Sequence, residues 1–87
     1  MSTPKTVTVG RVVLNWNPAG WCYLADTGNS VLMVSQTKHS GQFIGWTAVA
    51  TADTSRVECF RIESAQAAAS ALTEKLRALR AALDEVL

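Results

Sequence analysis

This 87-residue sequence has no long apolar run, no marked excess of charge of one sign and no closely spaced cysteines. No stretch approaches the roughly 18 apolar residues that a membrane-spanning helix needs, so we expect no membrane partner. The polar first five residues lack the apolar core of a signal peptide. With 8 Lys+Arg against 7 Asp+Glu, the net charge is only +1, which is too small to attract nucleic acid over a distance, so nucleic acid is not the expected partner.

Residue types that carry chemistry are also scarce. Cys22 and Cys59 form neither a CxxC pair nor a zinc-type spacing, and we interpret them as buried free thiols in a reducing cytoplasm; the alternative is a single disulfide or a redox switch. The one histidine, His39, lies in a polar stretch, where we expect it to be solvated. The sequence has no P-loop, no dinucleotide fingerprint and no nucleophile elbow. It therefore predicts no catalytic residue, no metal site and no cofactor.

Residues 6–62 have the β-branched runs and turn residues of an antiparallel sheet. We expect one strand over 6–14, with a β-bulge at Gly10-Arg11, followed by a turn over 15–20. Strands over 21–25 and 31–35 form a hairpin, because Asp26-Thr27-Gly28 between them suits a tight turn. After a polar loop over 36–41, further strands are expected over 43–52 and 57–62. The pattern predicts a meander of about four to five strands.

Residues 64–87 are expected to form one long helix, because no Gly or Pro interrupts them and Ser64 can cap the first turn. Apolar residues recur at spacings of three and four: Ala65, Ala69, Leu72, Leu76, Leu79, Leu83 and Val86. A helix of this length spans about 35 Å, whereas short strands span only about 17–20 Å. The chain is thus expected to be a single α+β domain over 1–87, with its helix packed on the sheet and overhanging it.

The leucines beyond the sheet need another cover, since exposed apolar stripes mark interfaces. We expect a homodimer that associates through the helix, at Leu72, Leu76, Leu79, Leu83 and Val86. The alternative is that these residues only cover the protein's own sheet. A domain of this size buries only about 60–65% of the surface that its unfolded chain exposes, so its stability is marginal unless a partner covers more apolar surface.

Large aromatic residues on the predicted strands are the candidate binding residues for another protein: Trp16, Trp21, Tyr23 and Trp46. The predicted function is that of a small, non-enzymatic, cytoplasmic interaction or accessory protein acting as a homodimer. The alanine-rich helix is typical of a bacterium or bacteriophage with a high-GC genome.

The segment from Leu24 to Gly28 resembles the active-site segment of retroviral-type aspartic proteases, through Asp26-Thr27-Gly28. That resemblance implies a dimer in which the Asp26 carboxyls of two copies share one proton. The same residues are typical of a hairpin turn, which is the interpretation we favour.

The layout from Gly45 to Leu79, two strands followed by a helix, is similar to the sheet-plus-helix DNA-binding domains of plant transcription factors and of integrases. The resemblance implies stacking of bases on the four aromatic residues named above, with phosphates bound by Arg11, Lys38, Arg56 and Arg61. Those sheets carry basic residues toward the DNA groove, whereas residues 46–52 contain none. Nucleic-acid binding is therefore the alternative function.

Overall fold

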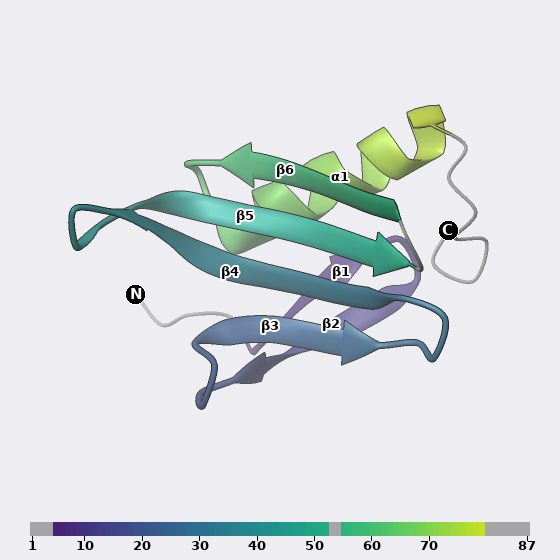
Figure 1. The fold of residues 1–87 in the computed structure, drawn as a ribbon, viewed down its shortest axis with the longest axis horizontal. Coiled ribbons are helices and arrows are strands. Elements are labelled where there is room, and N and C mark those ends of the chain that lie inside the picture. The colour runs from purple at the N-terminus through teal and green to yellow at the C-terminus, as the bar shows by residue number, and fades with distance from the viewer. Residues whose placement is uncertain (1–4, 53–54, 80–87) are drawn as a thin grey trace.

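The computed structural model describes residues 5–52 and 55–79, which form six antiparallel strands followed by one helix (Figure 1). The elements are β1 (Thr6–Val9), β2 (Val12–Asn17), β3 (Cys22–Asp26), β4 (Val31–His39), β5 (Gln42–Ala52), β6 (Ser55–Arg61) and α1 (Ala65–Leu79). Each strand pairs with the next, so the sheet order is β1-β2-β3-β4-β5-β6. The predicted α+β meander with a C-terminal helix is confirmed, with six strands rather than four to five.

The additional strand arises in residues 6–14, where one bulged strand was expected. Val9 pairs with Val12, which leaves Gly10 and Arg11 as a two-residue turn between β1 and β2. Gly10 has a φ of +59°, and a positive φ at the first turn residue suits a tight hairpin. The change of apolar side at Gly10 therefore marks a reversal of the chain and not a bulge.

Two of the expected connections are also shorter than the sequence suggested. β2 continues through Asn15 and Trp16 to Asn17, and β4 continues to His39. The β4–β5 turn is only Ser40-Gly41, and both residues have positive φ (+52° and +80°), as a type I′ turn requires. This hairpin consequently extends past the start of α1, at the left of Figure 1.

Helix α1 begins as predicted, because the backbone N–H of Ala67 donates to Ser64 Oγ at 3.0 Å. Its inner face is buried against the sheet: Ala65, Ala68, Ala69, Leu72 and Leu76. The sheet contributes the rest of the core: Val7, Val9, Leu14, Tyr23, Leu32, Val34, Ala48 and Ala50. Residues 80–87, which include the expected overhang, lie outside the described residues.

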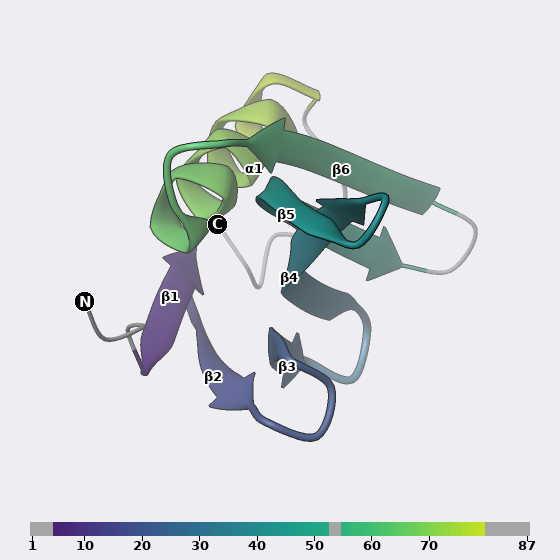
Figure 2. The ribbon, with the colours of Figure 1, turned by 90° about the vertical axis from the view of Figure 1, so that its left-hand side faces the viewer.

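The sheet is curled, and α1 lies between its two edge strands, β1 and β6 (Figure 2). Polar side chains of the helix bond to the backbone of both edges. Gln66 forms two hydrogen bonds to Thr8 of β1, and Lys75 Nζ donates to the Glu58 carbonyl of β6 at 3.1 Å. Since exposed strand edges recruit other strands, these contacts protect both edges of the sheet.

Candidate functional site

Five aromatic side chains form one row across the sheet: Trp21, Trp16, Tyr23, Trp46 and Phe43, which we call the aromatic row. Successive ring centroids lie 6.2, 5.0, 6.0 and 5.5 Å apart, and three of the four contacts are edge-to-face. Edge-to-face contacts are the geometry that aromatic pairs prefer. The row thus brings together all four of the aromatic residues that the sequence predicted as binding residues, with Phe43 added.

Exposure increases from the middle of the row to its two ends. Tyr23 is completely buried, and burial raises the pKa of its hydroxyl. Trp16 and Trp46 are partly buried against the core. Trp21 is 67% exposed and Phe43 is 50% exposed. Tyr23 therefore supports the row from inside, while the other four rings are available to a ligand.

Trp21, the most exposed ring of the row, lies at a backbone turn. It ends the turn between β2 and β3, in which Asn17 Oδ1 accepts a hydrogen bond from the backbone of Ala19 at 3.1 Å. Trp21 has a φ of +51°, a left-handed conformation that is unusual for a bulky residue. Backbone strain of this kind concentrates at functional sites.

Three cationic residues lie opposite aromatic residues of the row. The register pairs Lys38 with Phe43 and Arg61 with Trp46. At the start of β1, the Lys5 carbonyl accepts a hydrogen bond from the backbone N–H of Trp16 at 3.0 Å. Directly opposed residues project to the same face of a sheet. Sequence reasoning missed these pairs because they depend on strand register, which no local signal specifies.

The other two arginines of the sheet lie at the opposite end of the strands. Arg11 is in the β1–β2 turn, and Arg56 pairs with Thr51 and contacts Glu58 at 3.3 Å. The four basic residues of the sheet named in the sequence analysis therefore do not converge. Instead, Lys38 and Arg61 lie with Lys5 at the end of the sheet that carries the aromatic row.

The face of the sheet that α1 does not cover, which we call the outer face, has an apolar centre. One cross-strand row runs Thr6, Asn15, Leu24, Met33, Val49, Glu58. The next parallel row includes Asp26, Val31, Thr51 and Arg56. Leu24 is 37% exposed and Val31 is 41% exposed. Apolar side chains thus occupy the middle of the outer face and recur near its two edges at Val13 and Phe60, with polar or charged side chains among them.

The leucine stripe has a different environment from the one expected for an interface. Leu72 and Leu76 are completely buried in the chain's own core. Leu79 is the last residue of α1, and Leu83 and Val86 lie outside the described residues. The part of the stripe whose side chains are described thus covers the sheet of its own chain.

Asp26 belongs to the β3–β4 hairpin turn, as favoured from the sequence. Its Oδ1 accepts a hydrogen bond from the backbone N–H of Gly28 at 2.8 Å, and Gly28 has a φ of +92°. The backbone N–H of Thr27 donates to the Ser30 carbonyl at 2.9 Å. These contacts are those of a tight turn built on an Asp side chain.

Residues that bind metals do not gather anywhere in ranges 5–52 and 55–79, where no group of three His, Cys, Asp or Glu side chains is close enough to hold an ion. Cys22 is buried and Cys59 is partly buried, and both are free thiols. Within the same ranges, no helix is both long and apolar enough to cross a membrane.

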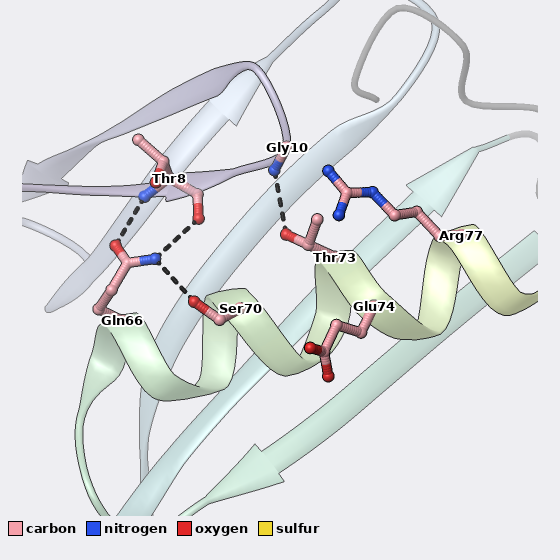
Figure 3. A pocket seen from close by; sticks show the side chains of 7 residues that line it. All are labelled: Thr8, Gly10, Gln66, Ser70, Thr73, Glu74 and Arg77. Carbon is pink, nitrogen blue, oxygen red and sulfur yellow. Dashed lines mark hydrogen bonds between the residues drawn. The ribbon is translucent and has the colours of Figure 1, made fainter.

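A polar hollow of about 240 Å³ lies between β1 and α1 (Figure 3). Gln66 and Thr73 reach across it, and Thr73 Oγ1 accepts from the Gly10 backbone N–H at 3.0 Å while donating to the Ala69 carbonyl at 2.9 Å. Glu74 points away from β1 (Figure 3). Because its central polar groups already bond to each other, the hollow is a structural joint between strand and helix.

Comparison of the chain with protein-family models, with curated proteins and with solved structures found no match.

Proposed function

We propose that this protein is a small, non-enzymatic interaction protein that acts by binding, to a second copy of itself and to a further partner. The observation that supports self-association is the apolar centre of the outer face. An antiparallel sheet with one solvated face normally alternates apolar and polar side chains. Here the solvated side of β3 and β4 carries Leu24, Met33 and Val31 instead.

The charges around this centre suit two identical copies. Asp26 and Arg56 stand at the two ends of one row, with Val31 and Thr51 between them. In a two-fold symmetric contact, each contact between two different residues occurs twice, once in each direction. An axis between Val31 and Thr51 brings Asp26 of each copy to Arg56 of the other. The Arg56–Glu58 pair within the chain is well exposed and contributes little, so Arg56 remains free to move.

Sedimentation tests the dimer and its location. We expect the wild type to be dimeric at about 100 μM, well above the affinity scale of functional dimers. Leu24→Glu with Val31→Glu should give a folded monomer, because both side chains are exposed in the single chain but buried without a partner charge in the dimer. Trp21→Ala, on the aromatic row, is the matched control and should leave the dimer intact.

Two further results distinguish the alternatives. A wild type that remains monomeric would contradict the dimer. If Leu79→Glu with Leu83→Glu dissociates the dimer while Leu24→Glu with Val31→Glu does not, the contact lies on the leucine stripe of the helix.

The free thiols of Cys22 and Cys59 support a reducing compartment such as the cytoplasm of a bacterium. In that compartment the protein would act as an accessory protein of the bacterium or of a bacteriophage.

A further inference from the structure

We propose that the aromatic row and its three opposing cations bind single-stranded nucleic acid. This names the class of the further partner in the proposed binding function. It uses a surface separate from the outer-face dimer contact, so each proposal fails on its own experiment.

Four rings of the aromatic row are accessible to a ligand. Single-stranded nucleic acid is bound by stacking its bases on aromatic side chains, and every base has a face to stack. Trp21 and Phe43 are exposed at the ends of the row, and Trp16 and Trp46 are partly exposed between them. Trp21 has the most exposed ring of the row and a left-handed backbone conformation. In a duplex the base faces are covered by neighbouring bases, so single strands suit this surface better.

Cationic residues lie beside the aromatic row, although the sequence as a whole has little net charge. Lys5, Lys38 and Arg61 pair with Trp16, Phe43 and Trp46, and all three cationic residues are exposed. The carboxylate that shares this end is Glu63, which follows Arg61 by two residues. Asp26 and Glu58 lie elsewhere, at the far end of β3 and on the outer face. Among the described residues, the end with the stacking surfaces therefore has three cationic residues against one carboxylate.

The arrangement matches a nucleotide chain in its chemistry. Each nucleotide has an aromatic base beside an anionic phosphate, and each of three aromatic residues of the row has a cationic residue opposite it in the backbone pairing. An acidic peptide would satisfy the cations but would leave the exposed rings without stacking partners. The observations thus favour a nucleic-acid strand over a peptide.

Fluorescence anisotropy of labelled oligothymidylate and oligouridylate tests the proposal and separates DNA from RNA. We expect binding that weakens between about 50 and 200 mM salt, with a log–log slope near −2 for three phosphate contacts. Trp21→Ala and Phe43→Ala should each weaken binding by about 5- to 150-fold, the range measured for loss of one stacked base. Trp21→Phe keeps a ring and should restore most of the affinity.

Charge variants with matched controls complete the test. Lys38→Ala or Arg61→Ala should reduce the salt slope by about 0.7, as loss of one contact to a single strand does. Arg56→Ala, at the other end of β6, and Leu24→Ala, on the outer face, should change neither affinity nor slope. Circular dichroism confirms that each variant is folded. Four outcomes would overturn the proposal. They are no binding of either oligonucleotide at low salt, and binding of duplex DNA as tight as that of the single strands. The other two are a loss of affinity in Arg56→Ala as large as in Lys38→Ala or Arg61→Ala, and complete displacement of the oligonucleotide by polyglutamate of the same total charge.

Discussion

The side chain of Gln66, in the first turn of α1, pairs with the backbone of Thr8 in β1 as a neighbouring strand would. The Thr8 N–H donates to Gln66 Oε1 at 3.0 Å, and Gln66 Nε2 donates to the Thr8 carbonyl at 3.2 Å. One side-chain amide therefore satisfies both polar groups of an edge residue. Gln66 Nε2 also donates to Ser70 Oγ at 3.1 Å, which holds the amide in position.

Replacing Gln66 should therefore cost stability in a specific way. Gln66→Ala removes both bonds to Thr8, and we expect a loss of about 1–2 kcal/mol in the free energy of unfolding, since each net bond contributes about 0.5–1.5 kcal/mol. Urea denaturation followed by circular dichroism measures it. A loss below the error of the measurement would show that water replaces both bonds without cost.

The variant Gln66→Glu makes the same contact depend on pH. A carboxylate still accepts from the Thr8 N–H but faces the Thr8 carbonyl without a proton to donate. The folded state therefore favours the protonated acid, which raises its pKa above the ordinary Glu value of about 4.3. The variant should approach wild-type stability at a pH below the ordinary Glu pKa, where the acid is protonated in both states. It should lose stability as the pH rises through the raised pKa of the folded state. A constant gap between the two proteins from acid to neutral pH would contradict this role.

Local signals allowed part of this fold to be predicted. The helix, its Ser64 cap and its buried face followed from spacing and propensity, and the β3–β4 turn followed from Asp26-Thr27-Gly28. The Gly10-Arg11 turn was missed because a positive-φ glycine suits a bulge as well as a reversal. The Gln66–Thr8 contact joins residues 58 positions apart, and the cation–aromatic pairs depend on register. Such contacts are decided by the packing of the whole sheet, which periodicity does not specify.

Removal of the helix cap should have a measurable effect. Ser64→Ala eliminates the bond to the Ala67 N–H, and we expect a loss of about 1 kcal/mol, typical of N-cap replacement. Ser64→Asp keeps an acceptor and adds a negative charge at the positive end of the helix dipole, so it should match or exceed wild-type stability. Thermal unfolding followed at 222 nm compares the three proteins. Equal melting of the Ala and Asp variants would exclude a capping role.

Any side chain at Gly45 is expected to destabilise the protein. Its φ is +151°, and an added Cβ would lie 2.7 Å from the Phe60 ring and 2.8 Å from the Arg61 carbonyl oxygen. Gly45→Ala should destabilise the protein by about 1–3 kcal/mol, the cost of a strained backbone position. Gly28→Ala is the matched control, because Gly28 also has positive φ (+92°) but has nothing within 4 Å of an added Cβ.

The comparison separates steric clash from backbone strain. Adding Phe60→Ala to Gly45→Ala removes the ring contact but leaves the carbonyl contact, so the double variant should show less than the sum of the two single losses. If Gly45→Ala lowers the free energy of unfolding no more than Gly28→Ala does, the close contacts at Gly45 do not contribute to the loss of stability.

The buried hydroxyl of Tyr23 should make stability depend on alkaline pH. Burial raises the pKa of Tyr23 above its ordinary value of 10.0, because the phenolate is poorly solvated in the core. The folded protein thus keeps a proton that the unfolded chain releases, so this contribution is complete below pH 10 and decreases as pH rises through the higher folded value. The chain has one tyrosine, so tyrosinate absorbance near 295 nm follows this group alone. We expect the native midpoint to lie above the midpoint measured in denaturant. Tyr23→Phe should remove both the absorbance change and the part of the alkaline loss of stability that this hydroxyl causes. If the native and denatured titration midpoints coincide, the Tyr23 hydroxyl is accessible to water and this prediction is wrong.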